Sequence, residues 1–406
     1  MADVAIDSAA SATTELQTGD GRWQVCTDKD TIYEFFEGTG GFSYSKSTDG
    51  GATWAADVPI GSGGIIYAIW YDKWTPGNSG TVIHIWYANA VADDVFYRSL
   101  TTATDTLGTE TTVVAHATMG NADTLNTLSG CRAQGGNLYV AVGINAGTDL
   151  LTFYRSTDAG ANWTSRTSPM EALGDYIQLY PANLADTNDI WGVYLDVSAD
   201  ELSLKTYDDS ANDWTSTAAE TSISGAGGLV ETTHTNSNSQ FFGSIRLSDE
   251  HLLLAFWNAY DGATADLKFY DITNAGTITA KTDVVSNSDD CFACAVFIDQ
   301  NTDDIYVGYL GKSDGSETAL ATVKVYYKKS TDDGTTWGSE VPYSEDTGDD
   351  FRALTCDLGG TTSLMAFAWY DDDDNDLFFG VTNSIEITAP AAAGTVGMLM
   401  MMGVGT

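Results

Sequence analysis

The sequence predicts an all-β protein, a β-propeller of four-stranded antiparallel blades, with seven blades favoured over six. Three observations carry this prediction. An eight-residue turn pattern that ends in tryptophan recurs along the chain, strand-like segments recur about every 56 residues, and no long stretch shows the periodicity of a helix. Because a repeat of this length accommodates four strands and their connections, we expect the repeats to close into one ring.

The recurring turn pattern is Ser-x-Asp-x-Gly-x-x-Trp. In a turn between two strands the Asp carboxylate accepts hydrogen bonds from backbone amides that follow it, and the Gly adopts a positive φ without steric cost. The Trp then re-enters the fold as a large apolar side chain. Three segments match the pattern, and a fourth keeps only the Asp and the Trp: Ser47, Asp49, Gly51 and Trp54; Ser156, Asp158, Gly160 and Trp163; Ser330, Asp332, Gly334 and Trp337; and Asp209 and Trp214.

These four segments resemble the Asp-box (BNR) repeat of sialidases and related β-propellers. The resemblance implies that the boxes lie on outer turns, away from the active centre. Sialidases use an arginine cluster for the substrate carboxylate, a Tyr–Glu nucleophile pair and an Asp as acid and base. Their Arg-Ile-Pro motif is absent, since the nearest segment reads Gly21-Arg22-Trp23-Gln24. The chain therefore argues against catalysis, and it identifies no catalytic residue.

The strand-like segments give the domain organisation. Residues 1–19 are small and polar and are expected to form an N-terminal arm, residues 20–388 the propeller, and residues 389–406 an apolar tail. The last blade must pair with another strand to avoid an open edge, and either residues 385–388 or residues 4–6 could supply that strand. The third strands of the seven blades are expected at 42–47, 95–100, 151–156, 202–207, 267–271, 325–330 and 377–382.

The charge of the chain limits its partners. The formal net charge is −40, from 57 acidic and 17 basic residues. Nucleic acid and anionic membranes are excluded, since both need clustered Lys and Arg. No segment has the length of a membrane span, and the first residues show no secretory signal. We expect an extracellular, virion or particle surface reached without a classical signal peptide, with a cytoplasmic location as the alternative.

Candidate ligand-binding residues fall on the predicted inner strands and at strand ends. Four arginines lie in or beside the inner strands and could converge on an anion in the central channel, or could instead offset acidic neighbours. Four tryptophans near strand ends could form a sugar-binding face, or could pack between blades. The arginines are Arg22, Arg132, Arg246 and Arg352, and the tryptophans are Trp70, Trp86, Trp257 and Trp369.

The remaining candidates are carboxylates that could act in catalysis or bind a metal ion, and no motif singles out a pair or a complete ligand set among them. Glu34, Asp72, Glu171 and Glu231 are conceivable members of a glycosidase carboxylate pair, but the sequence selects no pair. No cofactor is required. Ca²⁺ is the one metal suggested, and the alternative is a solvated acidic turn; its alternating carboxylates would be Asp372, Asp374 and Asp376.

The uncharged tail predicts a contact with other subunits, because methionine adapts to irregular apolar surfaces. Packing on the chain's own propeller is the alternative. The tail residues concerned are Met398, Leu399, Met400, Met401 and Met402. The sequence thus predicts a non-catalytic propeller that forms part of an extracellular or viral particle and presents a glycan- or receptor-binding face. The alternatives are an Asp-box glycoside hydrolase and an intracellular interaction scaffold.

Overall fold

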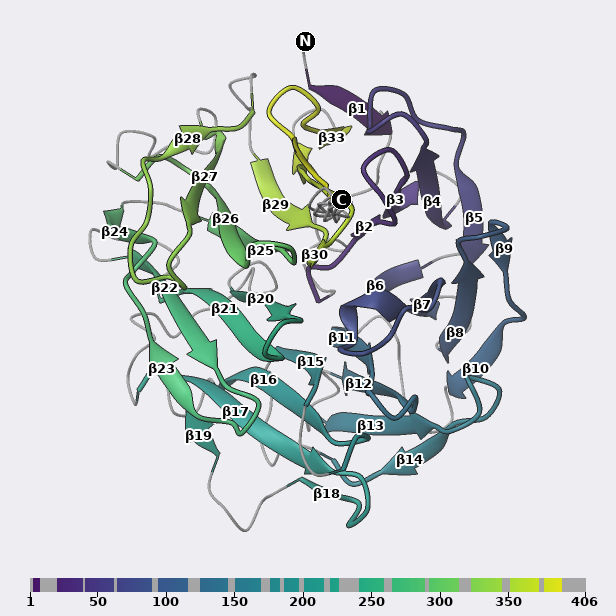
Figure 1. The fold of residues 1–406 in the computed structure, drawn as a ribbon. Coiled ribbons are helices and arrows are strands. Elements are labelled where there is room, and N and C mark those ends of the chain that lie inside the picture. The colour runs from purple at the N-terminus through teal and green to yellow at the C-terminus, as the bar shows by residue number, and fades with distance from the viewer. Residues whose placement is uncertain are drawn as a thin grey trace, which may run out of the picture.

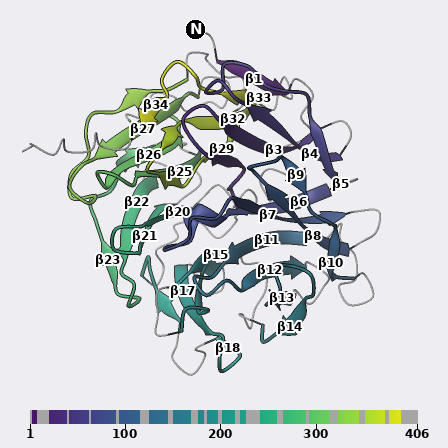
Figure 2. The same cartoon turned by 45° about the vertical axis from the view of Figure 1, so that its right-hand side comes forward.

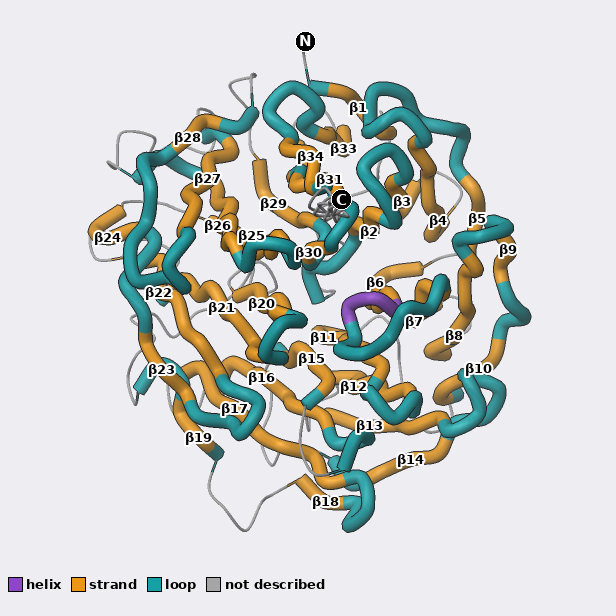
Figure 3. Tube along the Cα trace, in the orientation of Figure 1, coloured by secondary structure: helices purple, strands orange, loops and turns teal. Residues whose placement is uncertain are grey.

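Strands make up almost all of the regular structure in the computed structural model. It describes residues 3–7, 20–38, 41–61, 64–89, 94–115, 125–144, 150–168, 176–182, 186–196, 201–214, 220–225, 241–258, 265–288, 292–313, 323–344, 351–371 and 376–388. Within these ranges the only helix is the short 3₁₀ helix η1 (Asp72–Trp74), which lies close to the centre of the ring (Figure 3). The predicted all-β class is confirmed.

Seven antiparallel sheets of four principal strands are arranged around a central axis (Figure 1). Blade I contains β2 (Gln24–Cys26), β3 (Ile32–Gly38), β4 (Gly41–Ser47) and β5 (Val58–Gly61). Blade II contains β6 (Gly64–Tyr71), β7 (Val82–Asn89), β8 (Asp94–Thr101), β9 (Thr106–Leu107) and β10 (Thr111–Val114). Blade III contains β11 (Leu125–Arg132), β12 (Leu138–Ile144), β13 (Leu150–Ser156) and β14 (Thr164–Arg166). The first strand of each blade lies nearest to the axis.

The ring continues through blades IV to VII. Blade IV contains β15 (Ile177–Pro181), β16 (Ile190–Asp196), β17 (Glu201–Asp208), β18 (Asp213–Trp214) and β19 (Thr221–Ser222). Blade V contains β20 (Phe241–Arg246), β21 (His251–Trp257), β22 (Ala265–Ile272), β23 (Ile278–Ala280) and β24 (Val285–Ser288). Blade VI contains β25 (Phe292–Asp299), β26 (Asp304–Leu310), β27 (Val325–Ser330) and β28 (Val341–Pro342). Blade VII contains β29 (Phe351–Cys356), β32 (Phe367–Asp371), β33 (Asp376–Phe379) and β1 (Val4–Asp7).

The seven expected third strands are β4, β8, β13, β17, β22, β27 and β33, so the predicted blade number is confirmed. The second strands are covered on both faces by neighbouring blades. In β16, for example, every residue is buried. A strand buried on both faces reads as a continuous apolar run instead of an alternating pattern. Inner strands of adjacent blades also contact one another, as β11 does with β6 and β15 (Figure 2).

The N-terminal strand closes the ring. β1 pairs antiparallel with β33, with Val4 opposite Phe379 and Ala5 opposite Phe378. The competing segment, β34 (Ile385–Ile387), pairs instead with β31 (Ser363–Met365). Of the two strands that the sequence offered for closure, the N-terminal one therefore supplies the outer edge of blade VII.

The three complete Ser-x-Asp-x-Gly-x-x-Trp segments fold into the same turn after β4, β13 and β27. At the first, the Ser47 hydroxyl accepts from the Gly51 amide at 2.9 Å and donates to Asp49 at 2.9 Å. Asp49 also accepts from the backbone and side chain of Thr53 at 2.8 and 2.7 Å. The other two turns make the same four bonds at 2.7–2.9 Å. These bonds lower the pKa of Asp49, since they favour the carboxylate.

Each turn clamps an aromatic ring of the preceding blade. Gly160 has a φ of +89°, and a Cβ at this position would overlap the ring of Tyr97 on β8. Trp163 meets the same ring edge-on, with centroids 5.4 Å apart. Gly51 with Trp54 holds Phe379 in this way, and Gly334 with Trp337 holds Phe269. Glycine is thus required both for its positive φ and for the space that the ring occupies.

The incomplete fourth turn follows β17. Asp208 accepts from Ser210 and from the Ala211 amide at 2.7 and 2.8 Å, so Asp208 and not Asp209 bonds to the turn. Trp214 makes the same kind of contact as the tryptophans of the complete turns, since the centroid of its ring lies 5.0 Å from that of Phe153 on the preceding blade. Its indole N–H donates to the Thr167 carbonyl at 3.0 Å.

Gly160→Ala tests the clamp. The methyl group adds left-handed backbone strain to an overlap with Tyr97, and we expect a loss of roughly 2–4 kcal/mol in the free energy of unfolding. Gly276→Ala is the matched control, since Gly276 has a φ of +76° but nothing within 4 Å of the added Cβ. It should lose only about 1 kcal/mol. Equal losses in urea denaturation would contradict the clamp.

Candidate functional site

The face that bears the turns described above is the face whose connections the structure describes best. On it lie the connections between first and second strands and those between third and fourth strands. The two sets touch, as where the Gly50 amide donates to the Asp30 carbonyl at 2.9 Å. Every connection between a second and a third strand contains residues outside the described ranges. The described side chains that could form a site therefore lie on the turn-bearing face and along the axis.

Arg22 fills the axis. Its side chain is fully buried between the rings of Trp70 and Tyr180, whose centroids lie 4.9 and 5.1 Å from the guanidinium carbon. It donates to Asp20 at 2.6 Å, and further to Ser129 at 3.0 Å and to the Leu179 carbonyl at 3.2 Å. The guanidinium is thus neutralised within the protein and is not offered to a ligand.

A pocket of about 230 Å³ opens where the inner strands end on the turn-bearing face. It lies between the ends of β2 and β6, the loop after η1, and the segment that follows β29. Its walls carry hydroxyls, one amide, one ammonium group and one aromatic ring. The lining residues are Cys26, Thr27, Tyr71, Lys73, Asn78, Ser79, Leu247, Gly359, Gly360, Thr361 and Thr362. Hydroxyl and amide groups beside an aromatic ring suit a polar, uncharged or singly charged small molecule.

Asp357 joins the two walls of this pocket. Its carboxyl group is buried, and it bonds to the Trp74 indole N–H on one wall and to the Ser363 hydroxyl on the other, both at 2.8 Å. The strand β30 (Gly359–Gly360) is fixed from outside as well, because it pairs in parallel with β25. Burial raises the pKa of Asp357 to about 7, although these hydrogen bonds oppose the shift.

A second buried acid lies near Asp357. Glu34 on β3 is fully buried, and neither of its carboxyl oxygens has a hydrogen-bond partner. Burial, followed by the charge of Asp357, raises its pKa well above the ordinary value. Burial thus favours the protonated form of Glu34, whose side chain is not exposed to solvent.

Asp72 begins η1 and connects the pocket wall to blade III. It accepts from Asn78 at 3.3 Å and from His84 at 3.1 Å, and Arg132 lies 3.4 Å away. Burial acts against the Asp72 carboxylate, but the bond from His84 and the nearby charges outweigh it and lower the pKa. Burial lowers the pKa of His84, so the neutral imidazole donates from Nε2 to Asp72 and accepts from Tyr97 at Nδ1 over 2.7 Å. Asp72, His84 and Tyr97 are all buried, and the hydrogen bonds that join them link separate segments of blade II.

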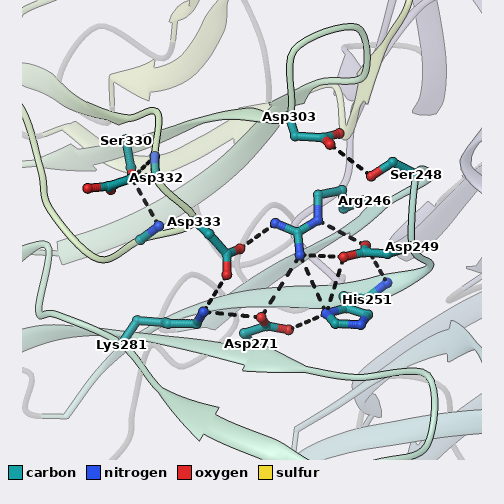
Figure 4. Close-up of polar contacts among 11 residues, drawn as sticks. Arg246, Ser248, Asp249, His251, Asp271, Lys281, Asp303, Ser330, Asp332 and Asp333 are labelled. Atoms are coloured by element: carbon teal, nitrogen blue, oxygen red, sulfur yellow. Dashed lines mark hydrogen bonds and ion pairs between the residues drawn. The ribbon is translucent and has the colours of Figure 1, made fainter.

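Arg246 belongs to a separate cluster between blades V and VI (Figure 4). It donates to Asp249 at 2.6 Å and forms an ion pair with Asp333 of blade VI. Lys281 bridges Asp333 and Asp271, and His251 contacts Asp271 at 2.8 Å. Each cation in this cluster therefore already contacts carboxylates, so the cluster joins two blades and offers no unpaired charge.

Similar pairs link other blades. The Asp105 carboxylate of blade II forms an ion pair with the Lys46 ammonium group of blade I, at 2.8 Å. Asp209 of blade IV receives Arg155 of blade III at 2.6 Å, and Arg166 lies 3.6 Å away. Asp209 thus serves in an ion pair between blades. Because these carboxylates sit in turns after the third strand, the pairs run between neighbours on one face of the ring.

The other candidates are placed as follows. Arg22, Arg132 and Arg246 contact three separate sets of partners, and the side chain of Arg352 lies outside the described residues. Trp70, Trp86, Trp257 and Trp369 are at most 1 % exposed, so they pack within the fold and not on its surface. Trp257 donates to the Ala293 carbonyl at 3.0 Å. Glu171, Glu231 and the tail residues from Ala389 onward also lie outside the described residues.

One group of acidic residues has the spacing of a metal site. Asp196, Glu201 and Glu220 of blade IV bring one carboxylate oxygen each within 4.8 Å of the others. Oxygen ligands of this kind suit Ca²⁺. Glu201 already accepts from Ser203 and Ser222, at 3.1 and 2.7 Å. Of the expected Ca²⁺ ligands, Asp376 begins β33, and Asp372 and Asp374 lie outside the described residues.

The pocket brings together residues that the sequence did not single out. Lys73, Ser79 and Thr361 are ordinary surface residue types, far apart in the chain, and no motif marks them. Their one shared feature is that each follows the end of an inner strand. Where several inner strands end at one axis, the residues that follow them must meet.

The comparisons with known proteins point to the fold. No known family matches the chain, and no curated protein does. An ulvan lyase of polysaccharide lyase family PL25, with bound -[GlcA(1-4)Rha3S]-, is similar over 96 % of this chain and 99 % of its own, at 10 % identity and a TM-score of 0.57. Hydrazine synthase of Kuenenia stuttgartiensis is similar over 89 % and 94 %, at 10 % identity and a TM-score of 0.51. Trypanosoma rangeli sialidase is similar over 77 % and 55 %, at 10 % identity and a TM-score of 0.46.

These likenesses show the fold alone, which a polysaccharide lyase and a hydrazine synthase both have. At 10 % identity they assign no residue roles. Among the described residues, no helix is both long and apolar enough to cross a membrane.

Asp357→Asn tests the buried carboxyl group. From about pH 4 to pH 7 the folded chain keeps Asp357 protonated while the unfolded chain releases the proton, so rising pH lowers the free energy of unfolding. This group alone would contribute about 1.4 kcal/mol per pH unit. In asparagine, Oδ1 still accepts from the Trp74 indole N–H and Nδ2 can donate to the Ser363 hydroxyl oxygen, with no group that titrates. The slope of stability against pH should therefore fall by that amount. Parallel curves for the two proteins in urea titrations at each pH would contradict the assignment.

Proposed function

We propose that this protein is a non-catalytic carbohydrate-binding propeller, which holds one sugar unit in the pocket at the end of its axis. It would act as a component of an extracellular or viral particle and present this face to a glycan or a glycosylated receptor. The observation that carries the proposal is the pocket itself, lined by hydroxyl, amide, ammonium and aromatic groups.

The size of the pocket supports a single sugar unit. Sites for drug-sized ligands occupy about 300–1,000 Å³. A volume of about 230 Å³ is smaller and fits one monosaccharide ring better than an oligosaccharide. The donors and acceptors come from Thr27, Asn78, Ser79, Thr361 and Thr362, and they match the alternating hydroxyls of a sugar.

The chemistry of the walls supports binding without hydrolysis. Glycoside hydrolysis needs two carboxyl groups on either side of the scissile bond. Among the described residues that line the pocket, none is an Asp or a Glu. Asp72 and Asp357 lie behind the walls and are occupied by hydrogen bonds from Asn78 and Trp74. A glycoside hydrolase and an intracellular scaffold remain the alternatives, and each predicts a different result in the first experiment.

Ser79→Trp tests the site. Ser79 is exposed and lines the pocket, so an indole there should fill the pocket without disturbing the core. We expect the full chain to bind members of a panel of immobilised polysaccharides and glycans, and the variant to lose at least about tenfold in affinity. Thr104→Trp, on an exposed turn of blade II, is the control and should bind as the parent does.

The same panel separates the alternatives. Release of reducing sugar or unsaturated product from a bound polysaccharide would favour an enzyme. Failure of the parent protein to bind any glycan would reject the proposal and favour the scaffold.

The particle role depends on the tail and has its own test. The apolar residues Met398, Leu399, Met400, Met401 and Met402 support docking onto another subunit. In light scattering at moderate salt, we expect the full chain to form a larger species and a chain ending at Thr388 to be monomeric. If both are monomers, the particle role loses its support, whereas glycan binding is unaffected.

A further inference from the structure

Lys73 is the charged residue of the pocket, and its surroundings differ from those of most other cations in the protein. Its ammonium group contacts the Thr27 carbonyl at 3.4 Å and lies 5.7 Å from the centroid of the Tyr71 ring. Among the described residues no carboxylate lies within 4.0 Å of it. A cation that contacts only a carbonyl and a ring retains donors for a further partner, because an ammonium group carries three.

This lack of a carboxylate partner is notable in such an acidic chain. With 57 acidic residues against 17 basic ones, a cation is expected to find a carboxylate. Most described lysines and arginines do so within 4.0 Å: Arg22, Lys29, Lys46, Arg132, Arg155, Arg166, Lys205, Arg246, Lys268, Lys281 and Lys329. Lys73 is held beside the pocket without one.

The acids near Lys73 are engaged by other donors. The carboxylate of Asp72, the preceding residue, accepts from His84 and Asn78, and that of Asp28 accepts from the amides of Asp30 and Thr31. Asp357 is buried and bonded to Trp74 and Ser363. The other side chains that line the pocket carry hydroxyls, an amide, an aromatic ring, the Cys26 thiol and the apolar side chain of Leu247, and none of them is an Asp or a Glu. An anion that enters the pocket therefore meets one positive charge and several hydrogen-bond donors.

We infer that the sugar bound in this pocket carries an anionic group, a carboxylate or a sulfate ester, and that Lys73 is the residue that selects it. The inference rests on the proposed carbohydrate binding and specifies its ligand class. A charge-assisted hydrogen bond from the ammonium group would orient the ring, while the hydroxyls of Thr27 and Ser79 contact the sugar hydroxyls. The same charge would offset the repulsion between an anionic ligand and a protein of net charge −40.

The test compares three probes that differ only at carbon 6: methyl β-D-glucuronide, methyl β-D-glucoside 6-sulfate and methyl β-D-glucoside. Affinities for the full-length protein are measured by ligand-observed NMR at low salt. We expect at least one anionic probe to bind about tenfold or more tightly than the neutral glucoside, and the stronger of the two identifies carboxylate or sulfate as the group. Added salt should reduce the preference.

Three variants assign the preference to Lys73. Lys73→Met should remove it, because the affinity for the anionic probe falls about tenfold or more relative to that for the neutral glucoside, and Lys73→Arg should retain it. Lys329→Met changes the net charge equally but lies on blade VI beside Asp304, so it should leave the preference intact.

The outcomes separate the inference from the proposed function. Equal binding of all three probes, or a preference that survives in Lys73→Met, would overturn the inference and leave carbohydrate binding standing. Equal loss of all three probes in Lys73→Met would also overturn it, because the lysine would then maintain the pocket and not select charge. If no probe binds and the glycan panel is also negative, both fail.

Discussion

The structure depends on the fit between each blade and its neighbour, and the clearest form of that fit is a glycine placed under an aromatic ring. At Gly51, Gly160 and Gly334, a ring of the preceding blade occupies the volume that a Cβ would fill. A tryptophan three residues later packs against the same ring. The angles between the seven neighbouring blades must sum to a full circle for the ring to close. A change in the packing at one junction would therefore have to be compensated at the others. The Ser–Asp hydrogen bonds set the turn so that glycine and tryptophan approach the ring together.

Charge is organised around the same junctions. In blades II, IV and VI, an Asp in the turn after the third strand forms an ion pair with a Lys or Arg of the preceding blade. These residues are Asp105, Asp209 and Asp333. Among the described residues, the cations that pair with a carboxylate of a neighbouring blade are Lys46, Arg132, Arg155, Arg166, Arg246 and Lys281. Lys73, which lies beside the pocket, differs from these cations, because among the described residues no carboxylate lies within 4.0 Å of its ammonium group. The Asp72–His84–Tyr97 chain, which contains every element of a catalytic relay, is instead buried structure.

The sequence predicted the ring well because its strands carry local signals. Continuous apolar runs and Gly- or Asp-bounded turns recur about every 56 residues, and such signals can be read without knowing which segments lie side by side. It predicted the site poorly because the site depends on which strand ends meet. Arg22 follows Asp20 by two residues, yet only the fold shows that the two neutralise each other between Trp70 and Tyr180. Asp209 has the box spacing, but Asp208 bonds to the turn, because a tyrosine, Tyr207, stands where the complete turns have serine. The pocket residues carry no motif at all.

Closure by β1 has a consequence for the order in which the chain can fold. Val4 precedes all the other strands of the ring in the chain, whereas its partner Phe379 follows the first six blades. The first strand therefore has no native partner while the other six blades are synthesised, because β33 follows all of them in the chain. Pairing between such distant residues is slow, because the loop must close before any contact is gained. A chaperone that shields β1, or a low local concentration of other copies of the chain, would matter most in this interval, when β1 could pair with β33 of another molecule.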